Sequence, residues 1–143
     1  MEKSEKIESQ PLDLFLRPPS KRATAIWAIS FFVVAFAIRL IGIGWGLPNE
    51  ARHQSLHPDE TINVLVANER PWFTPGFYNY GTLFFTLTKA SGEMGKTYGW
   101  IQVGESVESW QTLGGLTATS RIVSALAGAA TVAIVFLLLV WIT

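Results

Sequence analysis

The chain has 143 residues, no cysteine and a formal net charge of zero at pH 7, and 15% of its residues are charged. A soluble domain carries roughly 25% charged residues, so this composition disfavours a soluble globular protein. The balanced charge also argues against a nucleic-acid partner, because proteins that bind nucleic acids concentrate basic residues. The absence of cysteine is compatible with either side of a membrane.

Residues 1–22 are polar and charged, and we predict a disordered cytoplasmic tail because they hold too little apolar surface to fold alone. Basic residues beside the first apolar block favour an N-terminus inside the cell. They are Lys3, Lys6, Arg17, Lys21 and Arg22. The loop that follows the first block is then expected on the extracytoplasmic side.

Two long apolar blocks predict two transmembrane helices, over residues 23–46 and 119–143. Residues 25–46 contain a single charge, Arg39, and residues 122–142 contain none. A helix needs about 20 apolar residues to cross the hydrocarbon core, because each residue rises only ~1.5 Å. The alternatives are helices buried in a soluble core and, for the first block, a cleaved signal peptide. The first block is longer than the ~7–15 apolar residues of a signal peptide.

The end of the first predicted span contains glycines that loosen the helix and allow another helix to approach: Gly42, Gly44 and Gly46. Pro48 stops the helix. Arg39 lies about 9 Å before Trp45 along a helix that rises ~1.5 Å per residue. Its side chain is therefore expected to reach the membrane surface or to meet an anionic partner.

Residues 47–118 are too many for a plain connection, because structureless loops beyond ~15 residues are uncommon. Helical spacing predicts one helix over residues 59–69 and a second over 82–90, extending as far as residue 98. The second is expected to lie at the membrane surface on an apolar face formed by Leu83, Phe84, Phe85 and Leu87. Residues 99–115 are predicted to be a mobile loop. The predicted fold is an all-α integral membrane protein, with two transmembrane helices joined by a long extracytoplasmic loop that carries short interfacial helices.

The sequence His57-Pro58-Asp59-Glu60 follows the first span. Pro58 favours an extended His57, and Asp59 can then cap a helix, where the dipole and free N–H groups hold a carboxylate ionised. Glu60 would point about 100° away from Asp59, so different partners are expected for the two acids. The three side chains could act as a base or hold a divalent cation. The plain alternative is a helix cap among surface residues.

Four segments of the chain occur in the order that is typical of one protein family. They are RLIGIGWGLP at residues 39–48, HPDE at 57–60, FYNYGTL at 77–83 and RIVSALAG at 121–128. Over residues 23–143 the chain resembles the N-terminal part of the GT-C membrane glycosyltransferases that use polyprenyl-phosphate sugars. The bacterial relatives of protein O-mannosyltransferases and lipid A aminoarabinose transferases are the most similar. The third segment lacks the proline of the family's Tyr-Pro pattern.

The resemblance implies inverting transfer of a sugar from a polyprenyl-phosphate donor to an extracytoplasmic acceptor, at a bacterial plasma membrane. It implies that Asp59 is the catalytic base and that Glu60 is the second acid of the pair. Arg121 is expected to stabilise the departing phosphate. We also expect three further residues to contact substrate: His57, Tyr80 and Arg39. This role requires no metal, although a divalent cation is compatible with the motif.

Members of this family are several times longer and have more spans, so we expect 143 residues alone to be inactive. A further C-terminal region would then complete the donor pocket. The alternative function is a non-catalytic accessory subunit with two spans, derived from such an enzyme and bound to a larger membrane complex. A third interpretation is a metal-dependent lipid phosphatase that uses His57, Asp59 and Glu60.

Overall fold

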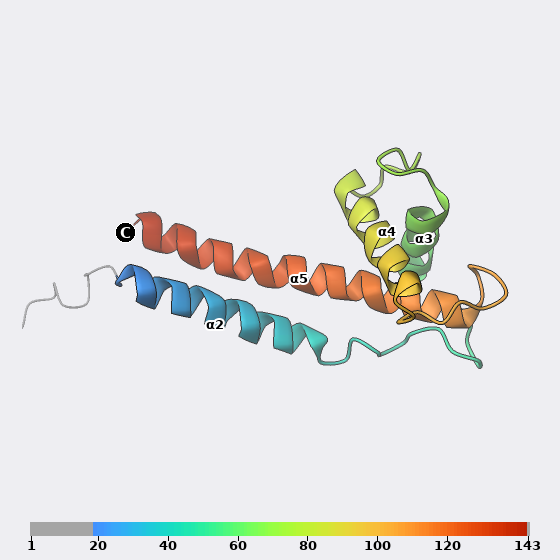
Figure 1. Cartoon of the computed structure of the whole chain (residues 1–143), viewed down its shortest axis with the longest axis horizontal. Coiled ribbons are helices and arrows are strands. Elements are labelled where there is room, and N and C mark those ends of the chain that lie inside the picture. Colours follow the sequence, from blue (N-terminus) through green and yellow to red (C-terminus); the bar gives the residue numbers. More distant parts are fainter. Residues whose placement is uncertain (1–18, 143) are drawn as a thin grey trace, which may run out of the picture.

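The computed structural model describes residues 19–142, which form helices without any β-strand (Figure 1). In chain order these are α2 (Lys21–Leu40), α3 (Pro58–Glu69), α4 (Thr82–Thr97) and α5 (Trp110–Ile142). Helices α2 and α5 run side by side, and α3 and α4 stand beside the N-terminal part of α5 (Figure 1). The predicted all-helical class is confirmed for this part of the chain. Most of the predicted tail, residues 1–18, lies outside the described residues.

Helices α2 and α5 are both long and apolar enough to cross a membrane. Only 11% of the residues in the most apolar stretch of each helix are buried within the protein, whereas a core helix of a soluble protein would be mostly buried. Their apolar side chains therefore face outward, as expected for helices surrounded by lipid. The two helices also contact each other, with the rings of Phe31 and Phe136 centred 5.0 Å apart.

The first helix that could cross a membrane ends earlier than predicted. Ser20 caps its start by accepting a hydrogen bond from the Ala23 N–H, and α2 ends at Leu40 rather than at residue 46. Residues 41–46 form turns instead, because Gly42 and Gly46 adopt φ values of 77° and 68°. These values lie in the left-handed region, which glycine enters without steric cost. The backbone carbonyls of Ile43 and Trp45 thus lie outside a regular helix.

The second long helix begins earlier than predicted, at Trp110 rather than at residue 119. The predicted mobile loop over residues 99–115 is therefore wrong in its last part. Gly114 and Gly115 suggested a loop, but both lie within α5. A Cβ atom on Gly115 would lie 2.7 Å from the Ile101 side chain, so glycine is needed here for close packing. The N-terminal part of α5 is thus a core helix, and its C-terminal part is the apolar span.

The two short helices match their predicted positions closely, but the packing of α4 differs from the prediction. Only Phe85 of the predicted apolar face is buried, whereas Leu83 is 71% exposed. The buried face consists of Phe85, Thr88, Gly92 and Gly95. A Cβ atom on Gly92 would lie 2.8 Å from Leu116 of α5, so the small residues allow the two helices to approach closely. Larger aliphatic side chains are left on the outer face.

Helix α4 lies across α5 (Figure 1), next to the residues that precede the uncharged block 122–142. The core beside this crossing is a cluster of Val64, Ile101, Leu113 and Leu116. Helix α4 therefore lies where the surface of a bilayer around the spans would be. A location within the interface stays a prediction, and it agrees with the exposed Leu83 and Leu87.

Candidate functional site

The His57–Glu60 motif forms the start of α3. His57 precedes the helix in an extended conformation (φ −95°, ψ 107°), and Pro58 is its first residue, where a missing N–H costs nothing. Asp59 and Glu60 both lie in the first turn, and no side chain caps the helix. The prediction that Asp59 caps α3 is therefore wrong, because the N-cap position is His57, two residues earlier. Both carboxylates still lie at the positive end of the helix dipole.

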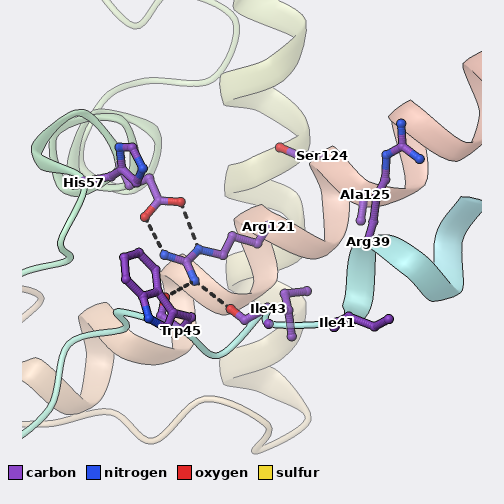
Figure 2. Close-up of a pocket in the computed structure, with 10 residues that line it drawn as sticks. Arg39, Ile41, Ile43, Trp45, His57, Arg121, Ser124 and Ala125 are labelled. Atoms are coloured by element: carbon purple, nitrogen blue, oxygen red, sulfur yellow. Dashed lines mark hydrogen bonds and ion pairs between the residues drawn. The ribbon is translucent and has the colours of Figure 1, made fainter.

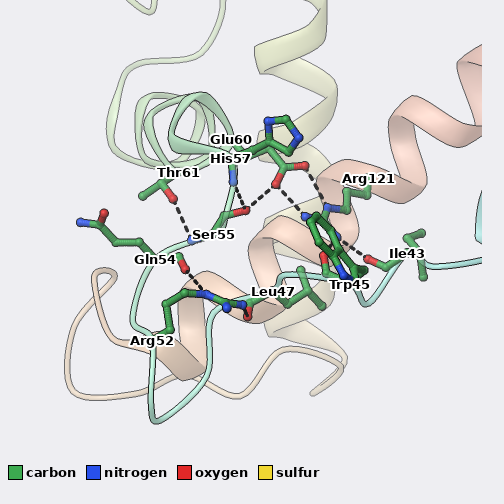
Figure 3. Close-up of polar contacts among 10 residues, drawn as sticks. All are labelled: Ile43, Trp45, Leu47, Arg52, Gln54, Ser55, His57, Glu60, Thr61 and Arg121. Atoms are coloured by element: carbon green, nitrogen blue, oxygen red, sulfur yellow. Dashed lines mark hydrogen bonds and ion pairs between the residues drawn. The ribbon is translucent and has the colours of Figure 1, made fainter.

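Glu60 is paired with Arg121 of α5 in a bidentate ion pair (Figure 3). Arg121 Nε donates to Glu60 Oε1 at 2.9 Å, and Nη2 donates to Oε2 at 2.7 Å. The Arg121 guanidinium lowers the pKa of Glu60 by hydrogen bonding, which outweighs the opposing effect of partial burial. Glu60 is therefore an anion held by a fixed partner, rather than a free base.

The remaining contacts of Arg121 reach the turns that follow α2. Nη1 donates to the backbone carbonyls of Ile43 and Trp45, each at 2.7 Å. Four of the five N–H donors of an arginine are thus used on protein groups. Arg121 joins α5, α3 and the turns after α2. Arg121 therefore holds these three segments together, and its side chain also lines a cleft.

Ser55 completes this network and was not predicted from the sequence (Figure 3). Its hydroxyl donates to Glu60 Oε2 at 2.5 Å and accepts from the His57 N–H at 3.3 Å. Its own N–H donates to Thr61 Oγ1. Ser55 lies in a loop, where no spacing of apolar residues marks one position over another, so its contact with Glu60 could not be predicted from the sequence. The buried Ser55 thus orients the carboxylate that Arg121 binds.

A first cleft, of about 420 Å³, lies beside this ion pair. We call it the arginine cleft, and in Figure 2 Arg121 lies between His57 and Arg39. Arg39 makes one hydrogen bond within residues 19–142, to the Ala35 carbonyl of its own helix at 3.1 Å. Its guanidinium lies over Gly128, where any Cβ atom would meet Nε at 2.7 Å. The lining residues are Arg39, Ile41, Gly42, Ile43, Trp45, His57, Glu60, Arg121, Ser124 and Ala125.

A second cleft, also of about 420 Å³, contains Asp59. We call it the Asp59 cleft, and its lining residues are Asp59, Ile62, Asn63, Phe77, Asn79 and Tyr80. Asp59 is exposed and has no ion pair among the described residues. The structure thus divides the predicted site residues between two clefts. Asp59 and Tyr80 share one, whereas Glu60 shares the other with His57, Arg39 and Arg121.

Within residues 19–142, the acidic and histidine side chains form no group of three that could hold a metal ion. His57, Asp59 and Glu60 are consecutive or nearly so, but they do not converge, because Asp59 and Glu60 line different clefts. No protein-family model, curated protein or solved structure matches this chain. The clefts and their contacts are therefore the basis for assigning a function.

Proposed function

We propose that this chain is the N-terminal part of a membrane glycosyltransferase that uses a polyprenyl-phosphate sugar, with Asp59 as general base. The main support is the unequal environment of the two adjacent acids. Arg121 neutralises Glu60, whereas Asp59 is exposed in a cleft without a cationic partner among the described residues. An unpaired carboxylate is free to accept a proton. Glu60 then serves to position the site instead of reacting.

The arginine cleft has the chemistry that the donor requires. Arg39 supplies N–H donors that no described carboxylate uses, and Ile41 and Trp45 supply apolar surface. A lipid phosphate combines a charged group with a hydrocarbon chain, so it matches a cleft that is cationic and apolar beside a transmembrane helix. Arg39 is in the last turn of α2 and its guanidinium lies over Gly128 of α5, so this cation is next to the apolar surface of both long helices.

In the proposed reaction, an acceptor hydroxyl attacks the anomeric carbon of the donor sugar. Its proton passes to the Asp59 carboxylate as the new carbon–oxygen bond forms. The bond between the anomeric carbon and the phosphate oxygen breaks, and both its electrons leave with the lipid phosphate. Attack opposite the leaving group inverts the anomeric carbon. Arg39 stabilises the charge on the departing phosphate, which needs no proton donor.

Replacing Asp59 with asparagine tests this proposal. Asp59→Asn keeps the size of the side chain but removes the base, and we expect at least about 100-fold slower transfer. Transfer is measured as labelled sugar moving from polyprenyl phosphate to acceptor, in membranes that contain the full-length enzyme of which this chain would be the N-terminal part. Glu69→Gln is the control, because Glu69 is an exposed acid at the other end of α3. Equal rates for Asp59→Asn and Glu69→Gln would remove Asp59 as the base.

The exposure of both long helices favours a second candidate, an accessory subunit without catalysis. Because 11% of the most apolar stretch of each helix is buried, most of this surface is open to a partner helix as well as to lipid. This role predicts a stoichiometric partner after purification in a mild detergent. A monomer that binds polyprenyl phosphate would favour the enzyme instead.

A further inference from the structure

The two clefts differ in charge, and this difference indicates what each one binds. The arginine cleft contains Arg39 and Arg121 against the single acid Glu60. The Asp59 cleft contains no cationic residue, and Asp59 is its only charged group. An anionic ligand such as a phosphate would be repelled there. The Asp59 cleft is therefore suited to a ligand, or part of a ligand, that is neutral and offers hydrogen-bond donors.

The two aromatic residues that line the Asp59 cleft, Phe77 and Tyr80, both pack against the buried Phe85. Phe85 is 3% exposed and forms edge-to-face contacts with both aromatic rings that line the cleft. Its ring centre lies 6.0 Å from that of Phe77 and 6.3 Å from that of Tyr80, with interplanar angles of 67° and 89°. Edge-to-face pairs of this kind are favourable and fix the ring orientations. Tyr80 remains 43% exposed, so part of its ring is free to contact a ligand.

The polar groups of this cleft lie next to those rings. Asp59 and Asn63 are one helical turn apart on α3, and Asn79 comes from the segment before α4. Asn63 Oδ1 is buried and has no hydrogen-bond partner among the described residues. A buried acceptor without a partner is costly, and such groups are usually satisfied by a ligand or by water. The Asn63 amide oxygen is therefore an unused acceptor in the wall of this cleft.

We infer that the Asp59 cleft binds a neutral carbohydrate, which is the acceptor of the proposed transfer. Sugar hydroxyls can donate to the Asp59 carboxylate and exchange hydrogen bonds with the amides of Asn63 and Asn79. The C–H groups on one face of a sugar ring can lie against Tyr80, because aromatic faces carry partial negative charge. The role of this carbohydrate as the acceptor rests on the proposed function, whereas carbohydrate binding can be measured by itself.

Saturation-transfer difference NMR on the chain in lipid nanodiscs tests this inference. The probes are the methyl glycosides of glucose, galactose and mannose. We expect a signal from the ring protons of at least one glycoside. Tyr80→Ala should weaken binding about tenfold or more, and Tyr80→Phe should retain it because the ring remains. Tyr78→Ala is the matched control, since Tyr78 is 69% exposed and does not line the cleft.

The Asn63→Ala variant tests the polar groups that line the Asp59 cleft, and we expect about tenfold weaker glycoside binding. Circular dichroism and thermal unfolding check that each variant is folded. Equal binding by Tyr80→Ala and Tyr78→Ala would overturn the inference. A second result would also overturn the inference: the protein responds to tetramethylammonium but to no glycoside, and Asp59→Asn abolishes that response. The cleft would then be a cation site.

The same variants separate this inference from the proposed function. Asp59→Asn should abolish transfer and also weaken glycoside binding, because it removes the carboxylate that accepts hydrogen bonds from the sugar hydroxyls. Tyr80→Ala should weaken both, whereas Tyr78→Ala should affect neither. Glycoside binding by this chain, without any transfer by the full-length enzyme of which it would be the N-terminal part, would overturn the proposed enzyme and leave the carbohydrate cleft standing. Transfer to an acceptor by a protein that binds no glycoside would overturn the carbohydrate cleft alone.

Discussion

Glu60 and Arg121, which are 61 positions apart in the sequence, form a bidentate ion pair. The same guanidinium binds the carbonyls of Ile43 and Trp45, so a single side chain connects α3, α5 and the turns after α2. The side chains of Arg121 and Glu60 are 17% and 30% exposed. The pair is thus partly shielded from water, and it forms one wall of the arginine cleft.

Removing one member of this pair should destabilise the protein. Glu60→Gln leaves the Arg121 charge without its partner, and we expect a loss of about 1–3 kcal/mol in the free energy of unfolding. Denaturation in detergent micelles measures this loss. Glu93→Gln is the control, because Glu93 pairs with Lys96 in an exposed i,i+3 contact whose loss should cost less than about 0.5 kcal/mol. Equal losses in the free energy of unfolding would show that the Glu60–Arg121 pair stabilises the protein no more than an exposed ion pair does.

The lowered pKa of Glu60 predicts how stability changes with pH. In the unfolded chain the pKa of Glu60 takes its ordinary value of 4.5, and Arg121 holds it lower in the folded protein. The pair therefore contributes fully above pH 4.5, and its contribution is lost as the pH falls through the folded pKa. Wild type should lose more stability than Glu60→Gln when the pH is lowered below 4.5. Parallel stability curves for the two proteins would contradict this assignment.

The turns after α2 should depend on one glycine more than on another. Gly46 has a φ of +68°, and a Cβ atom there would lie 3.0 Å from Leu56. Gly46→Ala should therefore destabilise the protein by about 1–2 kcal/mol, and it should also displace the Trp45 carbonyl that Arg121 binds. Gly44→Ala is the matched control, because Gly44 has an ordinary φ and nothing within 4 Å of the added atom. A thermal unfolding series that ranks these two variants in the opposite order would refute the account.

The membrane orientation can be tested with single cysteines, because the chain has none of its own. We expect Ser106→Cys, an exposed position between the long helices, to react with an impermeant maleimide added outside intact cells. Lys21→Cys at the start of α2 should react only after the membrane is permeabilised. The reverse labelling pattern would mean that the N-terminus lies outside.

The sequence predicted the elements whose signal is local. Each long apolar block is a helix, and the spacing of apolar residues placed α3 and α4 nearly at their observed positions. The errors in helix bounds and in the packing of α4 occurred at glycines, which can either end a helix or allow another segment to pack closely against it. Gly114 and Gly115 weaken a helix in isolation, but they lie inside α5 because Ile101 packs where a side chain would be. Gly92 and Gly95 likewise decide which face of α4 is buried.

The sequence by itself determined that this is a helical chain with two helices able to cross a membrane and an Asp-Glu pair at a helix start. These features depend on composition and periodicity within about 20 residues. Only the tertiary structure decided which acid is free. Arg121 reaches Glu60 because α5 extends back past α3, and adjacent residues on a helix point in different directions. Asp59 therefore faces a separate cleft with Asn63 and Tyr80, a grouping that no local pattern encodes.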